Sequence, residues 1–571
     1  MPQHRPASRH PRALIARLLQ DAHPSTEPFL RAYLLGWAAQ TLPAVLRVVL
    51  GAASRRGHRP LAVRRVLVQL LQALGKGFDP RGLGMAFAVA VGGAKWGEAL
   101  VEPAVRVAYF AGADKARALR EGKGKARETD ESLDAAQQRI VQDERTVRAL
   151  STFVSASVSS LAALLILQSS KPYRQRVRPL ATTTADDKLD FLLTPYTPAL
   201  PSSAASLTTV TSPSSAPPLP PAQYRATQSA TLDLTLFVLV RGADTLARLL
   251  YERAPPARGR AAPLLRFLAN QGDTIVFWLS CWRIMWAWFY RPELLPPSYS
   301  RWILTLARMD PRLLQLLRYA RAGRFVYGQK PDVEVAEMCA AIGKHARKDA
   351  RLVNPAVIDR LDCSFVHGKL GAGSCETNAA KRWARAFLDC LAIYLPVHAI
   401  PPLLFNLRRL LRTPSSSLLR ILLAASRSSA FLATFVASVY LGVCLTRTRL
   451  PQLARALGAA VPQQPLDAGA CVLVGCALCG ASVLIENKRR RREMALYCAP
   501  RALYALVDEL VPAALVTSPA GACLARWAER AVFSLASGMV VSASVHRPDL
   551  VSGVISGVTG FAVKGWDKYA T

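Results

Sequence analysis

Long apolar stretches alternate with polar segments along the chain. The clearest stretches cover 150–168, 273–290, 421–445 and 467–486. Each is near the roughly 20 residues that a helix needs to cross the hydrocarbon core of a bilayer. Weaker candidates cover 30–50, 83–109, 230–250, 386–405, 494–515 and 528–563. The pattern predicts an all-α, multi-pass transmembrane helical bundle with six to ten spans.

The polar segments suggest how the chain is divided. Residues 181–222 are dense in Ser, Thr and Pro, so they predict a disordered insert. Residues 115–149 are highly charged and suit an exposed helical hairpin or loop. We expect four parts: a basic N-terminal region with one possible membrane helix (1–80), a first membrane repeat (81–325), a polar connector (326–385) and a second membrane repeat (386–571).

Two pairs of segments resemble each other, which indicates an internal repeat. Residues 273–295 align without gaps to 529–551, and residues 235–250 align to 495–510. Identical pairs include Val276 and Val532, Phe277 and Phe533, Arg291 and Arg547, and Pro292 and Pro548. Duplication occurs in transporters and also in passive membrane scaffolds, so it does not choose between them.

Charged residues inside the apolar stretches are candidates for function, because charge is costly in a bilayer. Lys95 and Glu98 lie three apart, as do Arg241 and Asp244, so each pair shares a helix face. They fit either a polar lining for a substrate or ion path, or self-neutralised charges that hold helices together. Arg283 has no acidic neighbour in the sequence and is expected to snorkel or to bond another helix.

Small residues recur at four-residue spacing in the same stretches, as in Gly93 with Gly97 and Ser155 with Ser159. This spacing predicts close helix packing within the bundle.

The charge balance is strongly basic, with 73 Lys and Arg against 38 Asp and Glu and a net charge of +35. Because 51% of the residues are apolar and the basic runs lie between apolar stretches, we expect loops that contact anionic lipid headgroups rather than nucleic acid. Basic residues flank nearly every candidate span, so they do not orient the chain.

The 11 cysteines do not suggest a disulfide framework, since several, Cys444 among them, lie in apolar runs. Cys363, His367 and Cys375 form a small cluster whose spacing matches no standard zinc finger. A packed or disulfide-linked loop is favoured here over a structural metal site, and we expect no metal and no cofactor. The sequence also lacks a Gly-x-Ser-x-Gly, a phosphate-binding loop, a His-Glu-x-x-His and a dinucleotide fingerprint, which argues against an enzyme.

Several segments together resemble the transmembrane protein 135 family, in particular its fungal-type members. They are 284–303 (IMWAWFYRPELLPPSYSRWI), 481–506 (ASVLIENKRRRREMALYCAPRALYAL) and the Cys363, His367 and Cys375 region with 387–405 after it. The residues that carry the resemblance include Arg291, Pro292, Leu295, Pro296, Tyr299, Glu486, Arg489 and Arg490. The family is distantly similar to a group of peroxisomal membrane proteins and inner-membrane translocases. The long segment before the cysteine region and the Ser/Pro-rich insert depart from the animal members.

This resemblance implies an integral membrane protein of mitochondria or peroxisomes, acting without catalysis in lipid homeostasis or organelle dynamics. A transporter or channel is the first alternative; it requires Lys95, Glu98, Arg241 and Asp244 to face a common cavity. A membrane adaptor is the second; it would recruit fission or lipid-transfer proteins through basic loops at 171–178 and 488–492 and the charged segment 115–149. The oligomeric state is left open.

Overall fold

The chain is almost entirely helical, as the apolar pattern predicts. The computed structural model describes residues 26–53, 61–121, 133–170, 174–177, 225–229, 231–253, 262–368, 374–405, 407–510, 518–551 and 553–564. Within these residues a two-stranded sheet, β1 (Arg174–Val177) with β2 (Arg225–Gln228), is the exception to the helical pattern. The predicted insert 181–222 lies outside the described residues.

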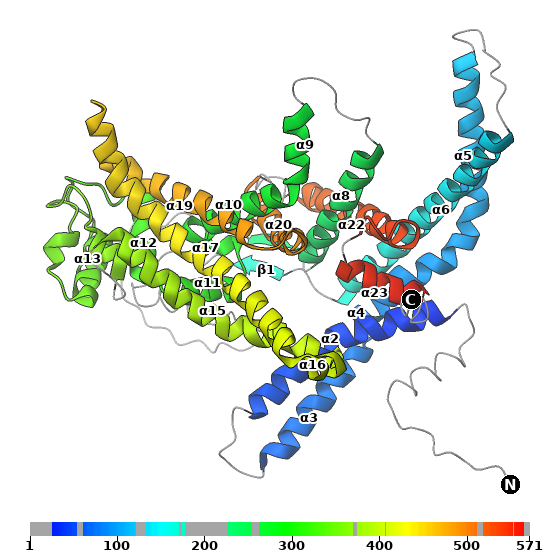
Figure 1. The fold of residues 1–571 in the computed structure, drawn as a ribbon, viewed down its shortest axis with the longest axis horizontal. Helices are drawn as coiled ribbons and strands as arrows, with labels where there is room; N and C mark the ends of the chain where they lie inside the picture. Colours follow the sequence, from blue (N-terminus) through cyan, green and yellow to red (C-terminus); the bar gives the residue numbers. More distant parts are fainter. Residues whose placement is uncertain are drawn as a thin grey trace, which may run out of the picture. The chain divides into compact units, whose positions relative to one another are not determined.

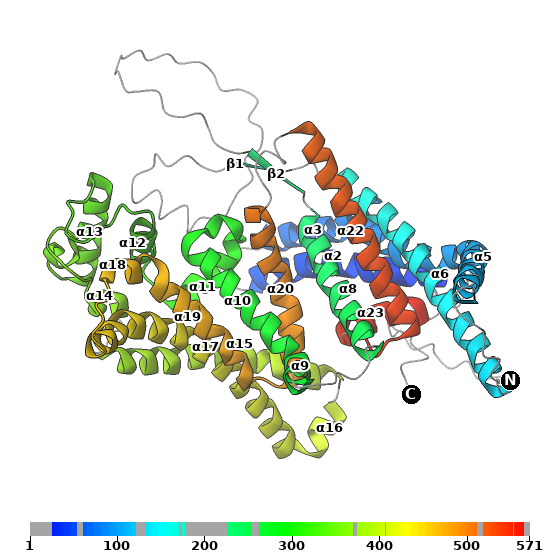
Figure 2. The same ribbon diagram turned by 90° about the horizontal axis from the view of Figure 1, so that it is seen from above.

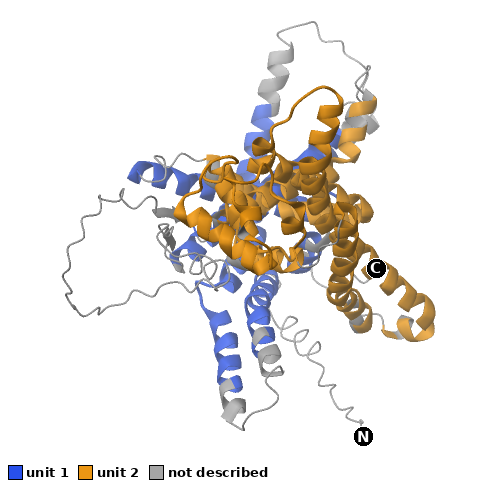
Figure 3. Cartoon of the chain, turned by 90° about the vertical axis from the view of Figure 1, so that its left-hand side faces the viewer, with its two compact units in different colours: residues 1–176, 225–256, 513–571 blue, residues 177–224, 257–512 orange. Residues whose placement is uncertain are grey.

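Two compact units divide the chain, and Figure 3 shows them in different colours. Unit 1 comprises residues 1–176, 225–256 and 513–571. Its described helices are α2 (Glu27–Ala53), α3 (Leu61–Gly75), η1 (Lys76–Phe78), α4 (Leu83–Phe87), η2 (Ala88–Gly92), α5 (Gly93–Glu121), α6 (Leu133–Ser170), α8 (Leu232–Arg253), α22 (Pro519–His546) and α23 (Gly553–Lys564).

Unit 2 comprises residues 177–224 and 257–512. Its described helices are α9 (Ala262–Asn270), α10 (Gly272–Tyr290), η3 (Pro292–Leu294), α11 (Pro297–Ala307), α12 (Pro311–Arg321), α13 (Val333–Ala346), η4 (Ala350–Val353), α14 (Cys363–His367), α15 (Cys375–Phe405), α16 (Leu407–Arg412), α17 (Pro414–Ala456), α18 (Gln463–Pro465), η6 (Leu466–Ala470), α19 (Cys471–Gly480), η7 (Ala481–Ile485) and α20 (Lys488–Leu510). The long helices α15 and α17 run side by side (Figures 1 and 2).

These units do not follow the predicted ranges 81–325 and 386–571. The helices from α10 to α20 belong to unit 2, although α10 lies within the predicted range 81–325. Helix α22, within the predicted range 386–571, belongs to unit 1. The predicted connector 326–385 is part of unit 2 and carries helices of its own. In the charged segment 115–149, α5 continues to Glu121 and α6 begins at Leu133, so its described residues are helical.

Four helical segments among the described residues are long and apolar enough to cross a membrane: Val141–Ser169, Cys375–Ile400, Pro414–Ala456 and Gln463–Ile485. Three of them overlap three of the four clearest predicted stretches, namely 150–168, 421–445 and 467–486. The fourth, Cys375–Ile400, overlaps the weaker candidate 386–405. Four of the six to ten predicted spans are thus found among the described residues by length and composition. The predicted span 273–290 forms α10, which carries four tryptophans, Asp273 and Arg283 and is not among these four segments.

Short polar residues begin several helices where the sequence turns from a loop into an apolar run. Asp310 caps α12 by accepting the backbone N–H of Arg312, and Pro311 supplies the first helical position. Asp362 caps α14 through the N–H of Ser364, and Ser518 caps α22 through the N–H of Gly521. These caps fix where α12, α14 and α22 start.

Small residues bring α5 and α6 of unit 1 together, as their spacing predicts. The Ser155 hydroxyl donates to the backbone carbonyl of Ala94 at 2.7 Å. A Cβ on Gly97 would collide with the Ser155 hydroxyl, and one on Gly93 would lie 3.3 Å from Ser159. Helix α6 also packs against α22, which packs in turn against α8.

In unit 2, the backbones of α17 and α19 meet at Gly442 and Gly475. A Cβ on Gly442 would lie 2.8 Å from the Gly475 Cα, and a Cβ on Gly475 would lie 2.8 Å from the Val439 carbonyl oxygen. The main apolar core of the unit is built mostly from α10 to α13, α17, α19 and α20, with smaller contributions from α14 and α15. Helix α10 packs against both α19 and α20.

Replacing Gly442 by Ala should destabilise unit 2, because the added methyl group can be accommodated only if α17 and α19 move apart. Overpacking of this kind costs about 1–3 kcal/mol. Thermal unfolding of the detergent-solubilised chain should show a lower midpoint for Gly442→Ala. In the matched variant Gly112→Ala, the new Cβ meets open space within α5, so the midpoint should stay or rise, since Gly costs a helix about 0.5–1 kcal/mol relative to Ala. Equal midpoints for the two variants would contradict this account of the contact.

Candidate functional site

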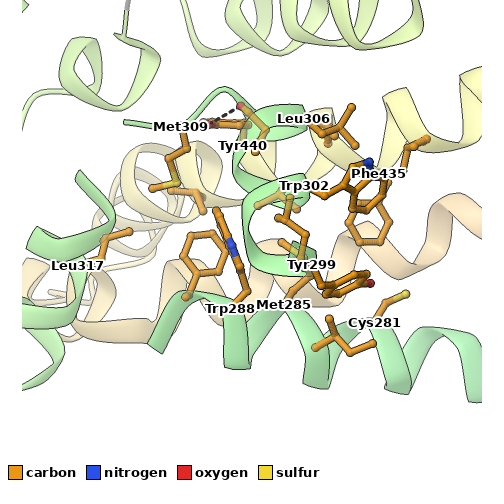
Figure 4. Close-up of a pocket in the computed structure, with 18 of the residues that line it drawn as sticks. Cys281, Met285, Trp288, Tyr299, Trp302, Leu306, Met309, Leu317, Phe435 and Tyr440 are labelled. Atoms are coloured by element: carbon orange, nitrogen blue, oxygen red, sulfur yellow. Dashed lines mark hydrogen bonds between the residues drawn. The ribbon is translucent and has the colours of Figure 1, made fainter. Parts of the chain in front are cut away.

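An apolar cavity of about 740 Å³ lies within unit 2 (Figure 4). Pockets of about 300–1,000 Å³ typically take one small organic ligand. Most of its wall comes from apolar and aromatic side chains of α10, α11, α12, α17 and α20. Figure 4 shows Trp288, Met285 and Cys281 of α10 opposite Leu306 of α11 and Phe435 of α17. The cavity is therefore suited to an apolar molecule.

The wall is elongated along α17. It includes residues of this helix from Phe431 to Arg447, which at 1.5 Å per residue spans about 24 Å. Tyr440, between them, donates its hydroxyl to the backbone carbonyl of Ala307 at 3.0 Å, which ties α17 to α11 across the cavity (Figure 4). The length and the volume together fit one extended chain or a fused ring system.

A buried ion pair between Arg447 and Asp467 forms one end of the wall. The Arg447 guanidinium also donates to the Leu361 carbonyl at 2.8 Å, and the Tyr327 hydroxyl donates to Asp467 at 2.6 Å. Asp467 lies in η6, a π-helical segment, and such segments are frequent at functional sites. Burial raises the pKa of Tyr327, so its phenol stays neutral and able to donate.

Polar residues of α20 form the other end. Phe431 packs edge-on against Phe277 at 5.9 Å between ring centroids, in a cluster that also contacts Met494. Glu493 and Tyr497 of α20 therefore line the cavity near the Phe431 end. The arrangement is an apolar tube with polar side chains at both ends.

Two of the residues that carry the family resemblance in segment 284–303 line this cavity. Pro296 and Tyr299 belong to the wall, and burial raises the pKa of Tyr299, which keeps its hydroxyl protonated. Leu295 is buried in the core beside them, and Arg291 and Pro292 form the turn between α10 and η3. This segment therefore shapes the cavity at the end of α10.

The second resembling segment builds a polar network around Glu486, which is buried. Glu486 accepts the Ser428 hydroxyl at 2.6 Å and lies 3.7 Å from the guanidinium of Arg490. Arg490 also contacts both ring nitrogens of His398, at 3.0 and 3.1 Å. Arg489 is exposed. The network joins the start of α20 to α15 and α17, which fits a structural role.

The cysteine cluster is brought together as the sequence suggests, with one addition. The sulfur atoms of Cys363, Cys375 and Cys444 lie within 4.8 Å of one another, and His367 Nε2 lies 3.6 Å from Cys444 Sγ. Contact with the Cys444 thiol and the charge of Arg447 lower the pKa of Cys363, which favours its thiolate form. Of the two alternatives expected here, a packed or a disulfide-linked loop, the structure has the packed one, because all three thiols are free.

The charged candidates of the apolar stretches lie elsewhere. Lys95 pairs with Glu98 at 2.8 Å, as predicted, and Glu98 also accepts the Thr152 hydroxyl at 3.0 Å. Asp244 accepts a bond from Arg248 at 3.1 Å, and the buried Arg241 lies over the Phe237 ring at 5.3 Å.

All four transporter candidates belong to unit 1, and none of them lines the cavity described above. Arg283 of unit 2 donates to the Ala505 carbonyl of α20 at 2.7 Å, so it bonds another helix, one of the two expected outcomes.

Sequence reasoning did not single out Cys444, Arg447 or Asp467. Cys444 read as one more small apolar residue of its run, and Arg447 and Asp467 stand near the ends of separate apolar stretches. A charge at the end of each of two apolar stretches is the one signal that could have suggested the ion pair.

Comparison with known proteins finds no matching family model, no matching curated protein and no matching solved structure.

Removing one partner of the buried ion pair should destabilise the chain strongly. Asp467→Leu leaves a buried guanidinium without its carboxylate, which typically costs about 3–5 kcal/mol. The double variant Arg447→Met with Asp467→Leu should recover much of that loss, because no charge then remains buried. Thermal unfolding followed by tryptophan fluorescence measures both effects.

The matched control is Arg547→Gln, which breaks an exposed pair with Glu252 and Asp549 and should lower the unfolding midpoint far less, because exposed ion pairs are screened by water. A double variant that is less stable than Asp467→Leu would show that the pair contributes more than charge compensation.

Proposed function

We propose that this chain is an integral protein of a mitochondrial or peroxisomal membrane that acts in lipid homeostasis by binding one amphipathic lipid in the unit 2 cavity, without catalysis. The observation that carries the proposal is the cavity itself: an apolar tube sized for one ligand, with hydrogen-bonding groups at its ends. The choice of organelle rests on the resemblance of 284–303 and 481–506 to the transmembrane protein 135 family.

Exposed apolar side chains on the candidate spans support the membrane part of the proposal. On α15, Leu388, Ile393, Val397 and Ile400 are each more than half exposed. Soluble proteins rarely expose contiguous apolar surface on this scale, whereas lipid solvates it without cost. The basic residues Lys488 and Arg489 at the start of α20 are also exposed, which suits contact with anionic headgroups.

A lipid fits the cavity better than a polar solute does. The aromatic and branched side chains that make up most of the wall offer dispersion contacts along about 24 Å of α17. The charges of Arg447 and Asp467 already neutralise each other, so an uncharged or singly charged headgroup is favoured over a strongly charged one. A fatty acid and a sterol both meet these requirements.

We also propose that the two units arose by duplication and have exchanged one helix. The sequence matches relate α8 to α20 and α10 to α22. Within unit 1, α22 packs against α6 and α8, and within unit 2, α10 packs against α19 and α20. Each unit thus holds one matched helix of the other repeat: α22 lies in unit 1 and α10 in unit 2.

Equivalent hydrogen bonds support this duplication. The Trp278 indole of α10 donates to the Ala477 carbonyl at 2.5 Å, and the Ser534 hydroxyl of α22 donates to the Ser157 carbonyl at 2.7 Å. Trp278 and Ser534 occupy the same position in the matched segments 273–295 and 529–551.

The small-residue contacts repeat in the same register. In unit 1, Ser155 lies two residues before the acceptor Ser157 and makes the close contact with Gly97. In unit 2, Gly475 lies two residues before the acceptor Ala477 and makes the close contact with Gly442. The hydrogen bond and the glycine contact therefore both indicate that α6 corresponds to α19, with Ser155 at the position of Gly475 and Ser157 at the position of Ala477.

Carbonate extraction tests the membrane part. A tagged full-length chain should stay in the membrane pellet of purified mitochondria or peroxisomes, because four apolar helices anchor it. Release of the chain into the alkaline supernatant would contradict an integral membrane protein. Enrichment in another organelle would leave the membrane claim intact and overturn the organelle assignment.

Ligand binding tests the lipid part. The full-length chain in nanodiscs should bind radiolabelled palmitate or cholesterol saturably. Leu317→Trp and Met309→Trp fill the cavity from its wall, and each should weaken binding by about tenfold or more, equivalent to about 1.4 kcal/mol.

The control is Leu388→Trp, an exposed position of α15 outside the cavity wall, which should leave binding unchanged. Competition between palmitate and cholesterol distinguishes the two lipid classes. Absence of saturable binding to either, or equal loss in the control, would contradict the proposed function.

A further inference from the structure

Three cysteine thiols of unit 2 lie together, and His367 contacts one of them. Cys363 begins α14 and His367 ends it, four residues later, so both lie on one face of this short helix. Cys375 is the first residue of α15, and Cys444 lies in the buried part of α17. Three separate segments therefore contribute to one cluster, which local sequence spacing alone would not produce.

The distances suit a tetrahedral metal site. Zinc bonds thiolate sulfur at about 2.3 Å, so the sulfur atoms of such a site lie about 3.8 Å apart. The three sulfur atoms here lie within 4.8 Å of one another, and His367 Nε2 lies 3.6 Å from Cys444 Sγ. His367 is not within 4.8 Å of all three sulfur atoms, so its imidazole would have to move toward Cys363 and Cys375 to complete the array.

The surroundings also suit a closed structural site. Cys444 and His367 are buried, whereas Cys363 and Cys375 are half-buried. Arg382 donates to the His367 backbone carbonyl at 2.8 Å and so holds the end of α14 in place. Three thiolates around a divalent ion carry a net charge of only −1, and the nearest arginine, Arg447, one turn along α17 from Cys444, is paired with Asp467.

We propose that Cys363, Cys375, Cys444 and His367 bind one Zn²⁺ ion as a Cys₃His structural site. Soft thiolate and imidazole ligands in a tetrahedral array select zinc over the oxygen-seeking ions. The ion would fasten α14 and the start of α15 to α17. Val366, next to His367, lines the apolar cavity, so the site would also order one part of the cavity wall.

Zinc content tests the site directly. The full-length chain, purified in detergent with reduced thiols, should contain one zinc per chain by elemental mass spectrometry. Cys444→Ser and Cys363→Ser should lose this zinc. Cys363 is half-buried at the start of a short helix, so its replacement perturbs the core less than that of Cys444. Cys390→Ser, at a fully buried cysteine outside the cluster, should keep it.

Cobalt substitution tests the ligand set. After zinc is removed with a chelator, Co²⁺ should give thiolate charge-transfer bands and the intense visible bands of tetrahedral coordination. His367→Ala should change the visible bands and lower the zinc affinity by about tenfold or more, since it removes one of four ligands. An unchanged spectrum in His367→Ala would overturn the assignment of the fourth ligand.

The competing chemistry is a disulfide between two of the three cysteines. Peptide mapping without reductant would reveal it. A Cys363–Cys375 disulfide in the folded chain, or a reduced chain that takes up neither zinc nor cobalt, would overturn the metal site.

Discussion

The ion pair between Arg447 and Asp467 is the interaction on which the organisation of unit 2 depends. The pair joins α17 to η6. Arg447 also donates to the Leu361 carbonyl, and Asp467 also accepts the Tyr327 hydroxyl, so the same two side chains hold the segments around Leu361 and Tyr327. A buried arginine needs a partner for its charge, because an unpaired charge in a protein interior costs several kcal/mol. Nε and Nη2 of Arg447 are bonded to Asp467 and Leu361, whereas Nη1 is buried without a hydrogen-bond partner among the described residues, so the pairing with Asp467 offsets most of the cost of burying this charge.

The other features of unit 2 lie close to this pair along the chain. Cys444 of the thiol cluster is three residues before Arg447, hence on nearly the same face of α17, and Val443 and Tyr440 on that face line the cavity. One helix thus carries the ion pair, a proposed metal ligand and a wall of the proposed lipid site. A shift of α17 would alter all three together, which couples the stability of the unit to the shape of its cavity.

Composition and periodicity predicted the helices well, because an apolar run of about 20 residues has few alternatives to a helix. They predicted the Lys95–Glu98 pair and the close approach of α5 and α6 for the same reason: both follow from local spacing. The cavity, the ion pair and the place of Cys444 depend on tertiary packing instead. His367 and Cys444 are 77 residues apart, and Arg447 and Asp467 are 20 apart on different helical segments. No local pattern encodes such pairs.

The division of the chain into units has a consequence for biosynthesis. Apart from residues 177–224, unit 2 is continuous, from 257 to 512, whereas unit 1 includes α22 near the end of the chain. Chains emerge from the ribosome from the N-terminus, and domains tend to fold as units once their residues are available. The second unit can therefore assemble before the first, although most of the first is synthesised earlier. Until α22 arrives, the faces of α6 and α8 that it covers require lipid or a chaperone to shield them.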